Sequence, residues 1–199
     1  MTVSRALSNN PKVKDETRTL VLKRAQELGY VKSVAAKAMR GEKTTVVGLL
    51  LPNLVNEFYA RFADNLAAAL ERNGLQVVIH LTNDDIEMER QSLLRLHEIQ
   101  AQAVVMVPAP GMLEEEAFYL KDMRVIQLIR QRTLKTASSA ILIHDAAAIM
   151  EAVEVLAGQG HKRIGYLGAQ QYLSSGNERL HAFRAGMQAV GLSSIKSVL

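Results

Sequence analysis

The chain has 199 residues, of which 48% are hydrophobic, and its 24 Lys and Arg side chains against 20 Asp and Glu give a net charge of +4. A composition this apolar and weakly charged is not that of a disordered chain. Domains usually run to roughly 100–150 residues, so one large domain and a small one fit. The absence of cysteine excludes disulfides, thiolate nucleophiles and Cys-ligated zinc.

The chain has no pattern of a secreted or membrane protein. Its longest apolar runs fall far below the ~18–20 residues that cross a bilayer. The first residues do not have the basic, apolar and small-residue pattern of a signal peptide. We therefore expect a cytoplasmic protein without a membrane span.

Positive charge is concentrated at the N-terminal end. Residues 1–45 contain ten basic and four acidic side chains, a net charge of +6, whereas the remainder carries 14 basic and 16 acidic side chains, a net charge of −2. Such asymmetry suggests a polyanionic partner such as nucleic acid. The alternative is a solvated basic helix face, which charge alone does not exclude.

The first 43 residues have helical periodicity and no strand pattern. One predicted helical face, which ends before Gly29, contains Thr17, Val21, Arg24 and Leu28. Residues 33–40 predict a second, short helix with Ser33 as its N-cap. Because isolated helices shorter than ~12–15 residues are marginal in water, this second helix needs a partner to stay folded.

From Thr44 onward, short apolar runs alternate with longer amphipathic stretches. The expected strands are 46–51, 77–81, 103–107, 125–129, 140–143 and 163–167. The expected helices are 58–73, 87–99, 145–156 and 178–190. The strand segments are apolar on both faces, as strands between two helix layers require. The pattern therefore predicts a parallel α/β sheet with right-handed crossovers.

Three stretches resemble the LacI-type (LacI/GalR) bacterial transcriptional regulators. Residues 2–8, TVSRALS, resemble the recognition helix of that family, and the start of its third helix is matched by Val13, Thr17, Arg18 and Val21. The family's hinge is matched by Leu28-Gly29-Tyr30 followed by Ala36, Met39 and Arg40. Residues 160–168, GHKRIGYLG, resemble the strand that opens the second core subdomain, and the helix after it is matched by Glu178-Arg179-Leu180 and Phe183. The three motifs occur in the family's order and span nearly the whole chain.

The resemblance implies an α/β fold class: a partial helix-turn-helix headpiece and hinge helix, followed by a periplasmic-binding-protein-like parallel sheet core. The expected parts are a partial DNA-binding headpiece at 1–29, the hinge helix at 30–43, the N-terminal core subdomain at 44–157 and an incomplete C-terminal core subdomain at 158–199. Relative to the family, the chain is then truncated at both ends. It begins inside the recognition helix, without the helix that braces it, so we expect weak, salt-sensitive DNA binding.

The resemblance also implies a set of DNA contacts. Arg5 is expected to donate two hydrogen bonds to a guanine edge. Phosphate contacts are expected from the hydroxyls of Thr2, Ser4 and Thr17, whose alternative role is helix capping or surface exposure. In the hinge, Ala36 and Met39 are expected at the minor groove, with Met39 wedged between base steps. The alternative for Met39 is a place in the core. Lys32-Ser33 stands where the family usually has Pro-Asn, so the start of this hinge helix is less rigid.

Candidate effector contacts lie after the predicted strands, where open parallel sheets bind ligands. By resemblance, Phe58 and Arg179 match effector-contacting positions and Asp145 matches an acidic position. Asn83 and Arg130 follow the second and fourth strands. An aromatic ring stacks on the apolar face of a sugar, while Asn, Asp and Arg bond to its hydroxyls. The alternatives are inward packing for Phe58, a helix N-cap for Asp145 and a surface ion pair for Arg130.

We therefore expect a sequence-specific DNA-binding regulator, a repressor, that binds operator DNA as a homodimer under the control of a sugar-like effector, a sugar or sugar acid. An enzyme is not expected, since the chain has no Gly-x-Ser-x-Gly elbow, phosphate-binding loop or dinucleotide motif, and we expect no cofactor or metal. One alternative is a cytoplasmic sugar-binding module without DNA binding, for which the basic segment 1–45 has no use. The other alternative is that the chain is a nonfunctional fragment.

Overall fold

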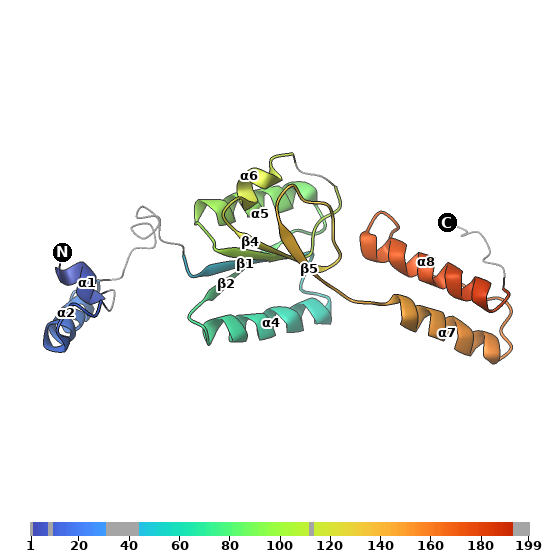
Figure 1. Cartoon of the computed structure of the whole chain (residues 1–199), viewed down its shortest axis with the longest axis horizontal. Helices are drawn as coiled ribbons and strands as arrows, with labels where there is room; N and C mark the ends of the chain where they lie inside the picture. The colour runs from blue at the N-terminus through green and yellow to red at the C-terminus, as the bar shows by residue number, and fades with distance from the viewer. Residues whose placement is uncertain (1, 8–9, 31–43, 112–113, 193–199) are drawn as a thin grey trace. The chain divides into compact units, whose positions relative to one another are not determined.

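The computed structural model describes residues 2–7, 10–30, 44–111 and 114–192. The chain divides into two compact units, Met1–Glu42 and Lys43–Leu199. In the first unit lie α1 (Thr2–Leu7) and α2 (Asp15–Glu27) (Figure 1). The predicted hinge helix at 33–40 lies outside the described residues.

The two helices of the first unit are joined by a turn that Arg18 fixes. Its Nη1 donates to Asp15 Oδ1 at 2.8 Å, and its Nη2 donates to the carbonyl oxygens of Asn10 at 3.2 Å and Val13 at 3.1 Å. Val13 and Ala6 are buried. One guanidinium therefore binds two carbonyl oxygens of the turn, of which that of Asn10 also accepts the N–H of Val13 at 3.1 Å, and it ties the turn to α2.

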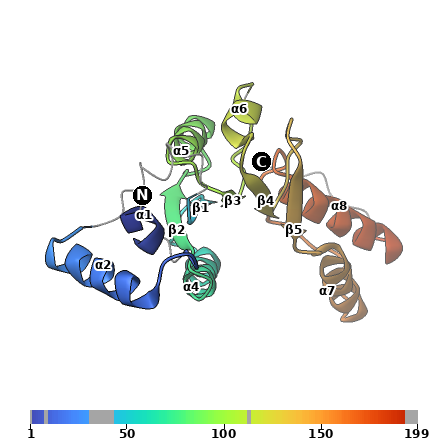
Figure 2. The ribbon, with the colours of Figure 1, turned by 60° about the vertical axis from the view of Figure 1, so that its left-hand side comes forward.

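The second unit contains the predicted parallel sheet. In the described part of the chain its strands are β1 (Val46–Leu51), β2 (Gln76–Leu81), β3 (Ala103–Met106), β4 (Arg124–Ile129) and β5 (Ser138–Leu142). All neighbouring strands pair in parallel, in the order β2-β1-β3-β4-β5 (Figure 2). The order places β1 and β3 in the interior of the sheet and β2 and β5 at its edges.

Helices cover both faces of the sheet (Figure 1). On one face lies α4 (Glu57–Glu71), whose Ala63 packs with Leu49 and Leu51 of β1. On the other lie α5 (Ile86–Glu98) and α6 (Glu116–Leu120), which form a second core cluster with β1, β3 and β4. The alternating side chains of β1 thus enter two cores, which explains its continuous apolar sequence.

Two sequence expectations about this sheet need correction, and one short helix that covers it was not expected. The strand β5 is exposed along its whole length, and β2 is only partly buried, because an edge strand has a neighbour on one side only. The short helix α6 was not predicted, since five residues carry too little periodicity to be recognised.

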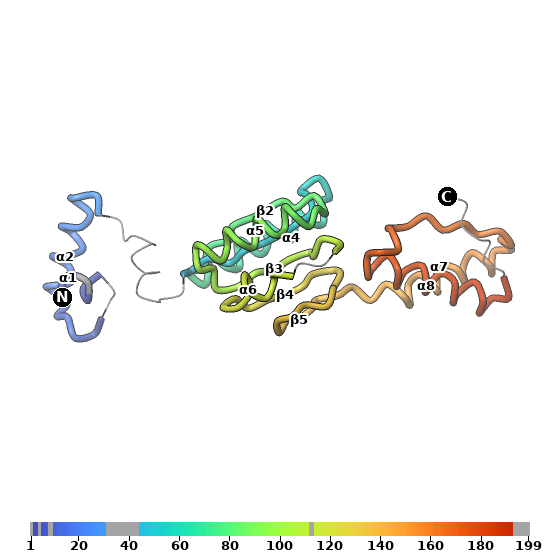
Figure 3. The backbone as a smooth tube through the Cα atoms, turned by 90° about the horizontal axis from the view of Figure 1, so that it is seen from above, coloured from blue at the N-terminus to red at the C-terminus, as the bar shows by residue number. Residues whose placement is uncertain are grey.

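The C-terminal part of the described chain holds two packed helices, α7 (Ala146–Gly158) and α8 (Ser174–Ala189) (Figure 3). Their shared core contains Val153, Phe183 and Met187. The strand predicted at 163–167 is absent: these residues are described and have no strand structure. A strand needs a neighbour for its backbone hydrogen bonds, and no described strand pairs with this segment. Its side chains Ile164 and Tyr166 pack on the helix pair instead.

Candidate ligand site and nucleic-acid interface

The carboxyl ends of the parallel strands lie along one side of the sheet, which we call the carboxyl edge. Two oppositely charged side chains meet there. Asp84 lies in the turn after β2, and Arg130 follows β4 directly. Nη2 of Arg130 donates a hydrogen bond to Oδ1 of Asp84. The Arg130 side chain is 7% exposed and its Nε has no hydrogen-bond partner among the described residues. Arg130 is therefore a buried cation at the carboxyl edge, not a member of an exposed surface pair.

A second pair joins the starts of α7 and α8. Nε of Arg179 donates to Oδ2 of Asp145, and the two side chains are 34% and 24% exposed. Asp145 stands at the N-cap position of α7, but its side chain makes no capping hydrogen bond. Its carboxylate is engaged by Arg179 instead, so the helix-capping alternative for Asp145 is wrong. Both charged groups remain partly open to solvent.

Tyr59 lies within the electrostatic reach of both pairs. It stands in the first turn of α4, which begins where Asn56 Oδ1 accepts the backbone N–H of Phe58 at 3.0 Å. Burial raises the pKa of the Tyr59 phenol above its usual value, Arg130 and Arg179 lower it, and Asp84 raises it. Because the usual pKa of a tyrosine phenol, about 10, already lies well above pH 7, the phenol is neutral there and able both to donate and to accept. The candidate contacts chosen from the sequence include the neighbouring Phe58 but neither Tyr59 nor Asp84, although both follow predicted strands.

The other two predicted contacts lie beside this group. Phe58 is 44% exposed. Its ring contacts the ring of Tyr59 edge-on, with 5.9 Å between the ring centroids, and stacks on the ring of Phe62, with 6.4 Å between the centroids. Asn83 has a positive φ of 50° and donates from Nδ2 to the sulfur of Met88 at 3.7 Å. Arg130, Asp84 and Arg179 therefore act on Tyr59 electrostatically, Asp145 is joined to this group through Arg179, and the ring of Phe58 lies next to Tyr59.

This group can bind a polar, uncharged molecule. Each guanidinium already has a carboxylate partner, so the two pairs carry no net charge, while their remaining N–H groups and lone pairs, with the neutral phenol, match hydroxyl groups. The described residues include no cluster of three or more His, Cys, Asp and Glu side chains that could hold a metal ion. None of the described helices is both long and apolar enough to span a bilayer.

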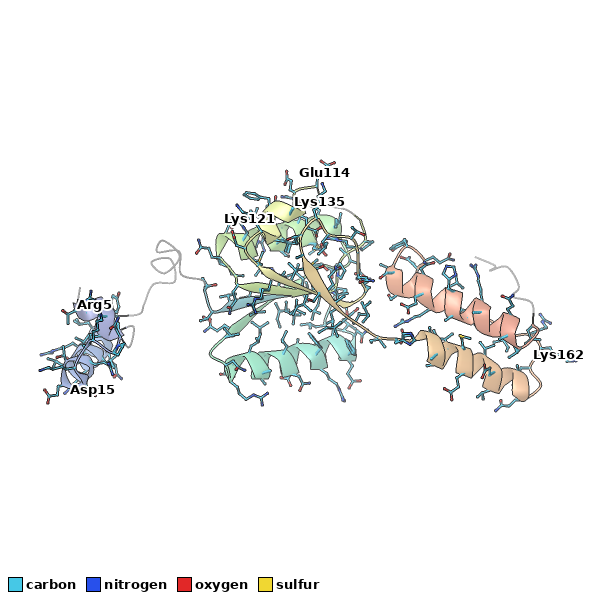
Figure 4. The ribbon with its side chains drawn as sticks, in the orientation of Figure 1. Arg5, Asp15, Glu114, Lys121, Lys135 and Lys162 are labelled. Carbon is cyan, nitrogen blue, oxygen red and sulfur yellow. The ribbon has the colours of Figure 1, made fainter. Side chains whose placement is uncertain are left out.

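The predicted DNA contacts fall on the first unit. Arg5 and Thr2 are exposed on α1, Ser4 lies in α1, and Thr17 is partly buried in α2 (Figure 4 labels Arg5). Further exposed cations in the described part of this first unit are Lys12, Lys14, Lys23 and Arg24. Ala36 and Met39 lie outside the described residues.

Comparisons with known proteins agree on one family. The profile described as bacterial regulatory proteins, lacI family, matches residues 1–33. The HTH-type transcriptional regulator DegA of Bacillus subtilis is 24% identical over the whole chain, which spans 60% of the length of that relative.

Two solved structures share the fold. The Lac repressor dimer bound to operator and the anti-inducer ONPF is 18% identical with a TM-score of 0.76, and the match covers 98% of this chain and 59% of that one. A complex of the transcriptional regulator CelR with cellobiose is 24% identical with a TM-score of 0.64, again over 98% of this chain and 59% of that one.

The headpiece profile, the relative that matches the whole chain and the shared fold converge on the same class of protein. The relatives are transcriptional regulators and not enzymes. The sheet unit has the periplasmic-binding-protein-like fold of the solved structures. Residues 1–33 therefore match the LacI family of bacterial regulatory proteins, and the chain is similar over its whole length to a transcriptional regulator.

Proposed function

We propose that the chain is a DNA-binding transcriptional repressor whose affinity for operator DNA responds to a sugar. The observation that carries the sugar part is the group at the carboxyl edge of the sheet, where two charge-balanced Arg–Asp pairs act on one neutral phenol beside exposed aromatic rings. CelR, a relative in fold, is known as a complex with cellobiose. The aromatic ring of Phe58 would stack on the apolar face of the sugar, and the Asp and Arg side chains would bind its hydroxyls.

The DNA part rests on the headpiece. Residues 1–33 match the family profile, and the exposed cations of α1 and α2 neutralise phosphates without requiring a fixed sequence. In this proposal Arg5 reads a guanine, while Thr2, Ser4 and Thr17 hold phosphates. Ala36 and Met39 belong to a hinge that lies against the minor groove.

The proposed arrangement has four parts: a headpiece at 1–29, a hinge at 30–43, an N-terminal core subdomain at 44–157 and the beginning of a second subdomain at 158–199. We also propose that the chain acts in the cytoplasm as a homodimer. Equilibrium sedimentation at high protein concentration tests the oligomer, since a species of single-chain mass throughout would contradict it.

Sugar binding can be tested with a fixed panel of ribose, galactose, maltose, cellobiose and gluconate. We expect at least one neutral sugar to raise the melting temperature and to give a heat of binding by calorimetry. The Arg179→Met variant should lose this response. The matched control is Arg61→Met, because Arg61 forms an exposed pair with Glu57 at 2.7 Å on α4.

The same protein is then titrated into fluorescent duplex DNA with and without the responding sugar. Our proposal predicts that the sugar changes the affinity for DNA. Sugar binding without any DNA binding would identify a sugar-binding module instead. A chain that binds neither would be a nonfunctional fragment.

A further inference from the structure

Behind the candidate site lies a buried ionic cluster that the proposed sugar contacts do not use. Nη2 of Arg132 donates to both Glu89 of α5 and Glu116 of α6, and these carboxylate side chains are 0% and 5% exposed. Nη1 of Arg132 donates to the carbonyl oxygen of Ala109 at 2.8 Å, and Glu89 accepts the N–H of Ala109 at 2.6 Å. Arg132 lies in the loop after β4. Its single guanidinium thus connects this loop to α5, to α6 and to the loop after β3.

The loop that carries Arg132 begins with a strained turn. Ile129 has a φ of +68°, and the N–H of Arg130 donates back to the carbonyl of Leu128 at 2.7 Å, which closes a γ-turn. A positive φ is unusual for a β-branched residue and persists only where the surrounding structure enforces it. The turn aims the Arg130 side chain into the sheet edge, where it meets Asp84.

Two anchors enforce this turn from its far side. The side chain of Gln127 accepts the N–H of Arg132 at 2.8 Å and donates to its carbonyl at 3.1 Å, so the segment is closed on itself. The Arg132 guanidinium then fixes the closed segment to α5 and α6. Without this second anchor, no bond would fix the closed segment to α5 and α6; besides the Gln127 bonds within the segment, only the Asp84 pair and the bond from the N–H of Gln131 to Ser174 Oγ, 3.0 Å long, would hold the loop.

We infer that Arg132 is a positioning residue for the candidate site: through its bonds to Glu89, Glu116 and Ala109 it holds the strained turn that presents Arg130 to Asp84 at the carboxyl edge. The inference rests on the proposed function, because Arg130 is a site residue only if the carboxyl edge binds a ligand. Arg132 itself does not touch the ligand. Its effect passes through the loop and not through general stability, which separates it from an ordinary buried ion pair.

The chain contains no cysteine, so one engineered cysteine reports on this loop alone. A nitroxide label on Gln131→Cys, whose side chain is exposed between the two arginines, is followed by electron paramagnetic resonance in the full chain. The variants are Arg132→Met and a neutral triple variant, E89Q/E116Q/R132M, in which no carboxylate is left buried without a partner. The matched control is Arg90→Met, which removes a partly buried guanidinium of α5 outside the cluster, where it pairs with Glu87 at 2.7 Å and donates to the hydroxyl of Tyr119 at 3.4 Å.

We expect the label to be restricted in the parent and in Arg90→Met, and to give a sharp, mobile component in both cluster variants. The pKa of Tyr59, followed by carbon-13 NMR of labelled tyrosine, should rise in the cluster variants because the Arg130 guanidinium moves away from the phenol. A folded triple variant with an unchanged line shape and an unchanged Tyr59 pKa would overturn the inference. A triple variant that no longer melts cooperatively would also overturn it, because the cluster would then hold the whole sheet and not one loop.

Neither readout requires a sugar. A parent protein that binds no sugar of the panel therefore refutes the proposed function separately, while the label and the Tyr59 titration decide the role of Arg132. If a sugar binds, its affinity for the triple variant should fall by about tenfold.

Discussion

Arg179 and Asp145, which stand 34 residues apart in the sequence, are joined by a hydrogen bond from Nε to Oδ2. Each satisfies the charge of the other before any ligand arrives, and both stay partly exposed. A hydroxyl group can therefore join this pair without leaving an isolated charge in the site, whereas a carboxylate ligand would compete with Asp145 for the guanidinium.

Replacing Arg179 by Met should lower the free energy of unfolding by only about 1 kcal/mol, because the pair is partly open to solvent. Sugar binding should be lost in the same variant. Urea unfolding and calorimetry measure the two effects separately. A large loss of stability together with unchanged binding would show that the pair only joins α7 to α8.

Two glutamates of α5 should give stability profiles of opposite sign. Burial raises the pKa of Glu89 above its usual 4.5. The folded chain then holds this proton more tightly than the unfolded chain. Its contribution to stability is complete below pH 4.5 and is lost as the pH rises through the raised pKa. Glu89→Gln removes the titration, so the melting temperature of the parent relative to this variant should fall as the pH rises from 4.5.

Glu87 supplies the control for that titration. A hydrogen bond from Arg90 lowers its pKa from 4.5 to about 2. The contribution of Glu87 to the free energy of unfolding is present above pH 4.5 and is lost as the pH falls through about 2. The melting temperature of the parent relative to Glu87→Gln should therefore fall in the acid direction. Parallel curves for the parent and both variants would show that neither shift exists.

The centre of the sheet should not tolerate a methyl group at Gly48. A Cβ there would lie 2.2 Å from Cδ1 of Leu96, a fully buried side chain that would have to shift. Gly48→Ala should cost about 1–3 kcal/mol. Gly158, the last residue of α7, has nothing within 4 Å of the same position, so Gly158→Ala should stabilise by about 0.4–1 kcal/mol. Urea unfolding measures the change in the free energy of unfolding for both variants. Equal changes would contradict the observed packing of α5 on β1.

The sequence predicts best those elements that are determined locally or buried on both faces. The segment 46–51 was recognised because both faces of β1 enter a core. The segment 163–167 has a similar apolar pattern, yet it forms no strand, because a pattern does not reveal whether a neighbouring strand exists. Likewise, Asp145 reads as a helix cap from its position, while its partner Arg179 comes from a distant helix. The Asp84–Arg130 pair also depends on the strand order.

The salt dependence of DNA binding is the most direct measurement, made by fluorescence anisotropy on a labelled duplex. We predict that the logarithm of the binding constant falls linearly with the logarithm of the salt concentration. Replacing Arg5, Lys14 and Lys23 by Ala should reduce this slope by about 0.9 for each phosphate that the variant no longer neutralises. The matched variant replaces Arg61, Lys121 and Lys162, three exposed cations of the sheet unit, and should leave the slope unchanged (Figure 4 labels Lys121 and Lys162). Equal slopes for the two triple variants, or binding that does not respond to salt, would contradict a DNA-binding headpiece.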